Sequence, residues 1–119
     1  NKLPTSGERV FITGGEKDVL SLAAHGFYGI AFNSETAKVP EDKLKELSER
    51  FKEIIFLYDS DETGIKESKE RVEDFKNRYK VSRLQLPLEG SKKEKDISDY
   101  FAIGNTTEDF IKLINEQRT

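Results

Sequence analysis

Five consecutive apolar residues, Ile-Ile-Phe-Leu-Tyr at positions 54–58, leave this chain few choices of fold. Successive side chains of a β-strand point to opposite faces, so a strand built from this run is apolar on both faces. Such strands lie in the middle of parallel sheets that helices cover on both sides. Charged residues make up 36% of the chain, against about 25% in typical domains. We therefore expect most charges on the outer faces of those helices.

Along the rest of the chain, short strand-like runs alternate with helical stripes, as in α/β domains. Strands are predicted at residues 10–12, 29–32, 54–58 and 81–86. Helical spacing predicts helices around residues 19–23, 44–51, 65–79, 96–101 and 110–114. His25-Gly26 is expected to end the first helix, and Thr106 to cap the last. We predict an α/β domain with an open, Rossmann-like sheet of about four mainly parallel strands and helices on both faces.

Length and composition set further limits. The 119 residues fit one domain, because typical domains contain about 100–150 residues. Residues 1–8 offer no obvious start, so we expect a piece of a larger protein. The absence of cysteine excludes disulfides and thiolate zinc sites. No apolar run approaches the roughly 20 residues of a membrane span, and no signal-peptide pattern opens the chain, so we expect a cytoplasmic protein. The net charge of −3 argues against nucleic-acid binding by bulk electrostatics.

Two aspartates, Asp59 and Asp61, follow the apolar run directly. In extended backbone the side chains at positions i and i+2 point the same way, so both carboxylates can face one point. Mg²⁺ prefers a few carboxylate oxygens and keeps its other positions for water and phosphate. The pair therefore indicates a metal site for phosphate chemistry, although Asp, Ser and Gly also favour a plain solvated turn.

Pairs of acidic residues follow three of the four predicted strands. In open parallel sheets, ligands bind at the carboxyl ends of the strands, where the strand order reverses. The acidic residues that we expect at this edge are Glu16 and Asp18 after the first strand, Asp59 and Asp61 after the third, and Asp96 and Asp99 after the fourth. Because each pair follows a predicted strand, their placement favours a common site over coincidence in a chain with 23 acidic residues.

These motifs resemble those of the Toprim domain. The resemblance rests on Gly-Gly-Glu-Lys-Asp-Val at positions 14–19, Tyr-Asp-Ser-Asp-Glu-Thr-Gly at 58–64 and Lys-Asp-Ile-Ser-Asp-Tyr-Phe at 95–101. It extends over about residues 10–101, and its strongest element is the Asp-x-Asp with a glycine three residues on. Toprim domains occur in bacterial-type primases, phage and mobile-element primase-helicases, topoisomerases and some nucleases. This chain looks most like the primase and primase-helicase branch.

The resemblance implies a DNA primase-type nucleotidyltransferase that uses Mg²⁺ or Mn²⁺ in the DNA replication of a phage or mobile element. Its partners would be DNA, nucleoside triphosphates, and helicase or zinc-binding domains of the same parent protein. In the family, paired aspartates hold the metal, and Asp59 and Asp61 match them. A glutamate after the first strand acts as general acid or base, and Asp18 matches an acidic position common at the start of the first helix.

This chain departs from the family at that glutamate. Family primases usually read Glu-Gly-x-x-Asp, and here Gly14 takes the place of the glutamate. Glu16 lies two residues later, and a flexible Gly-Gly turn can bring it to the metal. We therefore name Glu16 and Asp18 as catalytic candidates. The alternative is a site that has lost its acid/base group and kept only the metal or the fold.

Four basic side chains and the single histidine have simpler explanations beside the functional ones. Lys17 is a candidate contact for phosphate or nucleic acid because it lies near the start of a helix, and a solvated lysine is the simpler interpretation. His25 is better explained as a helix-ending residue than as a ligand. Lys92, Lys93 and Lys95 could attract a nucleic-acid backbone, but the acidic residues among them favour a polar loop.

Two further functions stay open. A receiver-like phospho-acceptor domain would carry one modified aspartate after its third strand, here Asp59. It would have no use for Asp61, and it would need an acidic pair where this chain has glycines. A catalytically degenerate Toprim module would serve DNA or protein binding instead, and Gly14 is consistent with it.

Overall fold

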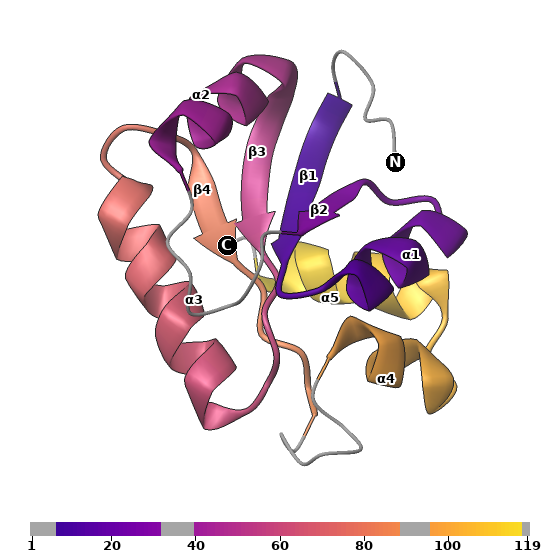
Figure 1. The fold of residues 1–119 in the computed structure, drawn as a ribbon. Coiled ribbons are helices and arrows are strands. Elements are labelled where there is room, and N and C mark those ends of the chain that lie inside the picture. Colours follow the sequence, from indigo (N-terminus) through magenta and orange to yellow (C-terminus); the bar gives the residue numbers. More distant parts are fainter. Residues whose placement is uncertain (1–6, 32–39, 89–95, 118–119) are drawn as a thin grey trace.

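The computed structural model describes residues 7–31, 40–88 and 96–117 (Figure 1). The predicted polar loops at residues 33–36 and 89–95 lie outside the described residues, and so do Lys92, Lys93 and Lys95. Among the helices of the described ranges, none combines the length and the apolar character that a membrane span requires.

Strands and helices alternate along the described parts of the chain. Their order is β1 (Gly7–Thr13), α1 (Glu16–Ala24), β2 (Gly29–Ala31), α2 (Glu41–Arg50), β3 (Phe51–Phe56), α3 (Glu62–Phe75), β4 (Val81–Arg83), α4 (Ile97–Ala102) and α5 (Thr107–Gln117). The strands form a sheet in the order β2-β1-β3-β4, and every neighbouring pair is parallel. The predicted α/β class and the open, parallel four-stranded sheet are confirmed.

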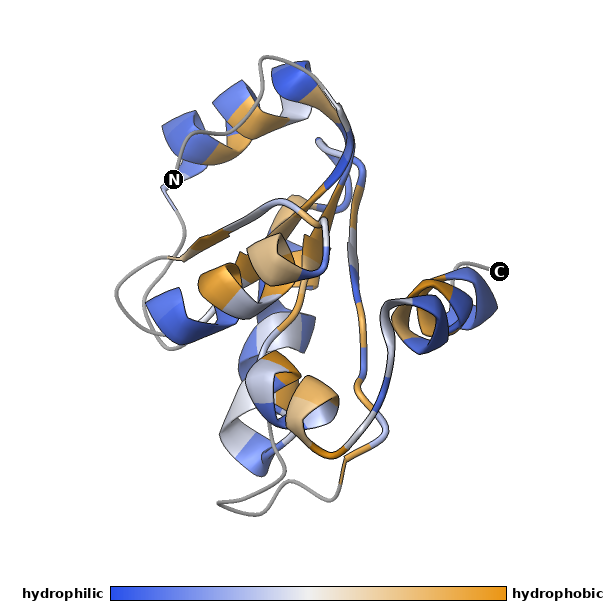
Figure 2. Cartoon of the chain, turned by 90° about the vertical axis from the view of Figure 1, so that its right-hand side faces the viewer, coloured by the Kyte–Doolittle hydropathy of each residue, from blue (hydrophilic) through white to orange (hydrophobic). Residues whose placement is uncertain are grey.

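Helices cover both faces of the sheet, which gives three layers (Figure 1). On one face, Val10, Ile12 and Phe56 pack with residues of α2 and α3. On the other face, Phe11 and Ile55 pack with residues of α1, α4 and α5. Neighbouring residues of β1 and β3 therefore bury opposite faces, as the alternation of side chains along a strand requires. Figure 2 shows the hydrophobic residues of α2 on its side toward the sheet and hydrophilic residues on its outer side.

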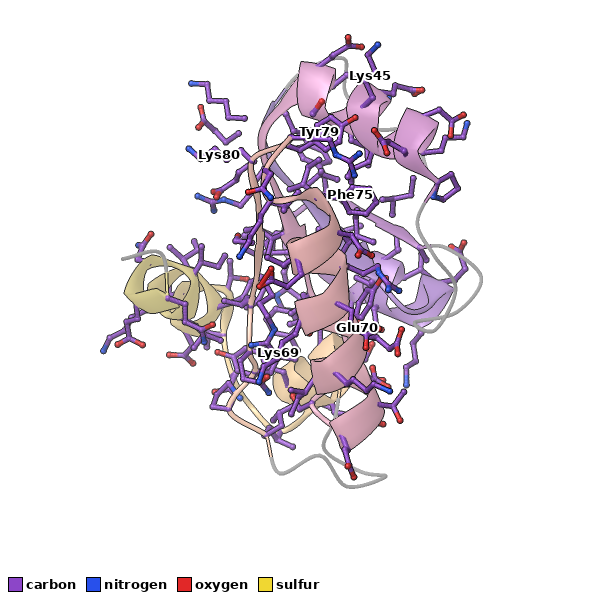
Figure 3. The ribbon with its side chains drawn as sticks, turned by 90° about the vertical axis from the view of Figure 1, so that its left-hand side faces the viewer. Lys45, Lys69, Glu70, Phe75, Tyr79 and Lys80 are labelled. Carbon is purple, nitrogen blue, oxygen red and sulfur yellow. The ribbon has the colours of Figure 1, made fainter. Side chains whose placement is uncertain are left out.

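The outer face of α3 is charged, and Lys69 and Glu70 are exposed on it (Figure 3). Arg71 departs from the expectation that charged residues lie on the outer faces of the helices, because it is only 4% exposed. It lies on the buried stripe of α3, four residues before a core phenylalanine. Its guanidinium pairs with carboxylates of its own helix, at 3.2 Å from Glu67 and 3.3 Å from Asp74. These pairs offset the cost of burying the charge.

The prediction that Phe51 belongs to the helical stripe was wrong. Phe51 begins β3, its backbone is extended (φ −124°, ψ 145°), and it pairs with Gly7 of β1. Phe51 lies in the same core as Leu44 and Leu47 of α2. The apolar spacing therefore continues across the junction between helix and strand and conceals it. Pairing with β1 decides the boundary, which local periodicity does not report.

Two other elements end earlier than predicted. β4 is three residues long rather than six. The Leu84 N–H still donates a hydrogen bond of 3.1 Å to the Phe56 carbonyl, but β3 itself ends at Phe56. Leu84 and Leu86 are buried although they lie outside the strand. The apolar pattern at residues 81–86 predicted their burial correctly, but it does not show where strand pairing ends. Likewise α3 ends at Phe75, and Tyr79 packs against the core from the turn that follows (Figure 3).

The predicted helix ends at His25 and Thr106 are confirmed. His25 is the C-cap of α1, and Gly26 follows in the left-handed region, with φ of 85°. Before α5, the Thr106 N–H donates to Asp109 Oδ2 at 2.9 Å, and the Asp109 N–H donates to Thr106 Oγ1 at 3.1 Å. This reciprocal pair is a capping box. The His25 ring also stacks on Phe101 at 3.7 Å, which ties α1 to α4.

The first turn of α3 packs against the backbone of Asp59, and Gly64 makes this approach possible. A Cβ atom at position 64 would lie 2.1 Å from the Asp59 carbonyl oxygen and 2.9 Å from the Asp59 nitrogen. Backbone atoms must move to relieve contacts that short. Gly64 therefore sets how closely α3 approaches the segment that follows β3.

We expect Gly64→Ala to lower the free energy of unfolding by about 1–3 kcal/mol, because the added methyl group overpacks a buried contact. Urea unfolding of both proteins measures the difference. Gly15→Ala is the matched control, since Gly15 is extended (φ −161°) and its Cβ would meet nothing within 4 Å. The control should change stability by less than about 1 kcal/mol. Equal losses in the two variants would contradict the packing argument.

Candidate metal centre

Three aspartates converge at the carboxyl end of the sheet. Asp18 lies in the first turn of α1, Asp59 follows β3, and Asp96 is the N-cap of α4. Each offers one carboxylate oxygen, and these oxygens all lie within 4.8 Å of one another. The strands β2 and β3 lie on opposite sides of β1, so the strand order reverses between β1 and β3. This is the position at which open α/β sheets bind ligands.

The geometry and chemistry of the three aspartates suit a hard divalent cation. Oxygens bound to one Mg²⁺ at about 2.1 Å stand at most about 4.2 Å apart. Small side-chain rotations reach that spacing from the 4.8 Å limit of this group. Carboxylate oxygens are ligands that Mg²⁺ and Mn²⁺ prefer, and three of them leave positions for water and phosphate. The group could therefore hold one such ion.

Asp18 lies in an unfavourable environment for a negative charge. It is only 5% exposed. Burial, and then the charges of Asp96 and Asp59, raise its pKa from 3.8 to about 7. A hydrogen bond of 3.3 Å from Ser98 Oγ and the positive charge of Lys17 oppose this rise. A divalent cation would relieve the repulsion, so the centre favours bound positive charge.

Both carboxylate oxygens of Asp96 have partners. Oδ1 accepts a hydrogen bond of 2.9 Å from the Asp99 N–H, and Asp99 Oδ2 accepts one of 3.4 Å from the Asp96 N–H. Oδ2 of Asp96 lies 3.3 Å from Lys17 Nζ. The structure therefore brings Asp96 into the centre, keeps Asp99 in the capping box of α4, and places the Lys17 ammonium beside both.

Two serines without a distinctive sequence signal join α1 to α4 beside the centre. The Ser98 hydroxyl lies 2.7 Å from the Ser21 hydroxyl and donates to Asp18. Ser21 lies one helical turn after Asp18, and Ser98 lies two residues after Asp96. This spacing from the aspartates is the one feature of the sequence that indicates a role for Ser21 and Ser98 at the centre. It is a weak indication, because serine is frequent near helix starts for capping reasons alone.

Asp61 is not a member of the three-aspartate group. It is the N-cap of α3, and its Oδ1 accepts a hydrogen bond of 2.8 Å from the Gly64 N–H. The chain bends at Ser60 and Asp61 instead of continuing as a strand, so the i, i+2 rule for extended backbone does not apply there. The structure joins Asp59 to the aspartates that follow β1 and β4. A shared ion between Asp59 and Asp61 stays a prediction.

Glu16 is the first residue of α1, exposed and outside the three-aspartate group. Gly14 stands at the position of the family glutamate. The acid/base role of Glu16 stays a prediction. The phosphate contact of Lys17 also stays a prediction, since the structure shows its pairing with Asp96 alone among the ion pairs it describes.

Comparison with known proteins assigns a family to this chain. The Toprim-like family matches residues 11–101, which is well over half of the sequence. The chain therefore belongs to the Toprim-like family. A sequence search of the curated proteins finds no match.

Solved structures from bacteriophage T7 share the fold. The crystal structure of the primase fragment of the T7 primase-helicase protein aligns with a TM-score of 0.71 and 23% identity, over 94% of this chain and 45% of that chain. A chain from the T7 lagging-strand DNA polymerase interacting with primase domains of two gp4 subunits bound to an RNA/DNA hybrid and dTTP aligns with a TM-score of 0.68 and 22% identity, over 92% of this chain and 54% of that chain. This chain thus spans about half the length of the chains that it matches.

The pKa of Asp18 predicts how stability depends on pH without metal. The folded chain holds a proton on Asp18 up to about pH 7, whereas the unfolded chain loses it near pH 3.8. The stabilising contribution of this proton is complete below the lower value and is lost as the pH rises to the upper one. At about 1.4 kcal/mol per pH unit, the loss is up to about 4 kcal/mol.

Urea unfolding in EDTA at pH 5 and pH 8 tests this expectation. Asp18→Asn, which cannot ionise, should lose less stability than the unmodified protein between the two pH values, and should be the more stable protein at pH 8. Asp42→Asn is the control, because Asp42 is an exposed acid of α2. A pH dependence unaltered by Asp18→Asn would show that Asp18 does not hold the proton.

Proposed function

We propose that this chain is the Toprim catalytic domain of a DNA primase or primase-helicase from a phage or mobile element, and that it catalyses nucleotidyl transfer with Mg²⁺ or Mn²⁺. The observation that supports this most directly is the convergence of Asp18, Asp59 and Asp96 at the reversal of strand order. Family membership and the primase folds of the similar structures support it as well. Its substrates would be nucleoside triphosphates on a DNA template, in the cytoplasm, beside helicase or zinc-binding domains of the parent protein.

The three aspartates would hold the ion in this proposal. When bound, the ion neutralises phosphate charge and orients the attacking oxygen. Asp18 would give up the proton that it retains near pH 7, because a cation favours its ionised form. Ser98 would hold the Asp18 carboxylate in position through its hydrogen bond. Glu16 is the candidate general acid or base, since it stands two residues after the family position at Gly14.

Primer synthesis by the full-length protein that contains this chain tests the proposal. We expect formation of short oligonucleotides on a single-stranded DNA template that depends on Mg²⁺ or Mn²⁺. Asp59→Asn should reduce it by at least about 100-fold, because a lost ligand removes several kcal/mol of stabilisation of the transition state. Asp42→Asn removes the same charge from α2 and should leave the rate unchanged. Equal activity of Asp59→Asn and the unmodified protein would refute a metal-dependent mechanism at this centre.

Glu16→Gln in the same assay examines the acid/base role. We expect a reduction of at least about tenfold, since general acid or base groups contribute about 10²–10⁴-fold. Unchanged synthesis would remove Glu16 from the mechanism. The readout is the initial rate at saturating metal, which separates the loss of a proton-transfer group from weaker metal binding.

A second candidate is a Toprim module that binds DNA or protein without catalysis, and Gly14 favours it. Under this alternative the unmodified protein makes no primers, and Gly14→Glu, which places a carboxylate where the family has one, gains metal-dependent synthesis. The family match does not favour the receiver-like alternative. Labelling of Asp59 by acetyl phosphate would be needed to revive it.

A further inference from the structure

The centre contains a cation of its own, the ammonium of Lys17. Its Nζ lies 3.3 Å from Asp96 Oδ2. The carboxylates of Asp99 and Asp18 add to the negative potential at this ammonium. Lys17 therefore neutralises part of the same negative charge that a divalent ion would neutralise.

Lys17 contacts the Asp96 oxygen that the capping box does not use, so a metal ion on that oxygen would compete with Lys17. Asp96 Oδ1 is engaged by the backbone of its own helix, in the capping box with Asp99. Oδ2 is the oxygen that remains, and it is the one that faces Lys17. An ion that binds Asp96 through Oδ2 must share this oxygen with the ammonium or displace it. Two cations on one oxygen repel each other, so displacement is favoured.

The burial of the two partners shows which of them can move. The side chain of Asp96 is 9% exposed, whereas that of Lys17 is 68% exposed. Asp96 is held by its cap, and Lys17 has a flexible stem in solvent. On leaving, the ammonium regains its hydration and the incoming ion takes over the neutralisation of the Asp96 charge, so Lys17 leaves at small cost. Its Cα belongs to the first turn of α1, next to Asp18, and the released ammonium stays within a side-chain length of the centre.

We propose that Lys17 is a tethered counter-ion which occupies Asp96 in the absence of metal and moves to the phosphates of the nucleotide once a divalent ion has taken its place. This inference rests on the proposed metal site at Asp18, Asp59 and Asp96. It assigns Lys17 two successive partners, a carboxylate and then a polyphosphate. Metal binding thereby makes the cation available that the incoming nucleotide needs, and the two ligands bind in a preferred order.

Two binding measurements on the full-length protein test the exchange. Titration with Mn²⁺ alone, followed by electron paramagnetic resonance of the free ion, gives the metal affinity. Titration with a non-hydrolysable nucleoside triphosphate at saturating Mn²⁺ gives the nucleotide affinity. We expect Lys17→Met to bind Mn²⁺ about three- to tenfold more tightly and the nucleotide about three- to tenfold more weakly, since one positive charge is removed from both sites.

Lys45→Met is the matched control. It removes the same charge from the exposed face of α2, which lies at the opposite end of the sheet from α4 (Figures 1 and 3). Both affinities should stay as in the unmodified protein. Lys17→Arg keeps the charge and should restore both affinities toward those of the unmodified protein.

The outcomes separate this inference from the proposed function. Opposite shifts in Lys17→Met, absent in Lys45→Met, support the exchange. Mn²⁺ affinity that is unchanged or weaker in Lys17→Met, while the unmodified protein binds Mn²⁺, overturns the exchange and leaves the metal site standing. Tighter Mn²⁺ binding with unchanged nucleotide affinity overturns the transfer to phosphate. Failure of the unmodified protein to bind Mn²⁺ at all overturns the proposed function together with the exchange.

Discussion

Strand β3 is paired on both edges and buried on both faces, and the positions of the other elements follow from this enclosure. The five residues at positions 54–58 are each at most 5% exposed. An apolar strand of this kind is stable only between two helical layers, which α2 and α3 supply on one face and α1, α4 and α5 on the other. The burial of β3 also sets the position of Asp59, which lies at the carboxyl edge of the sheet between the segments that carry Asp18 and Asp96.

The centre therefore combines two demands that oppose each other. Packing α1 and α4 against the sheet buries Asp18 and Asp96, and burial makes their negative charges costly. The structure meets part of that cost locally, with the hydroxyl of Ser98 on Asp18 and the ammonium of Lys17 on Asp96. It leaves part unmet, as the raised pKa of Asp18 shows. The remaining unfavourable energy of the buried negative charge favours the binding of a cation, because a cluster whose charges were already neutralised would gain little from an ion.

Local pattern was sufficient for the fold and for the edge at which the aspartates gather, and it failed where tertiary contacts decide. Phe51 keeps the spacing of α2 although it begins β3, because both positions face the same core. Asp61 follows Asp59 at the spacing of extended backbone, yet the chain turns at that point and Asp61 caps α3. Asp96 was predicted only to lie at the same edge of the sheet, since its approach to Asp18 depends on how α4 packs on α1. No sequence spacing encodes that contact between segments far apart in the chain.

Charge balance relates the number of metal ions to the substrate. Three ionised aspartates carry three negative charges, and Lys17 beside Asp96 reduces the sum to two. One divalent ion that displaced Lys17 would leave a single negative charge. Without an ion, a proton on Asp18 reduces the same excess, in agreement with its raised pKa. The family glutamate would add a further negative charge, and Gly14 withholds it. A second ion at this centre would therefore need negative charge from elsewhere, and under the proposed function the phosphates of a nucleoside triphosphate would supply it. By this balance, a first ion would be matched to the three aspartates and any second ion to the phosphates.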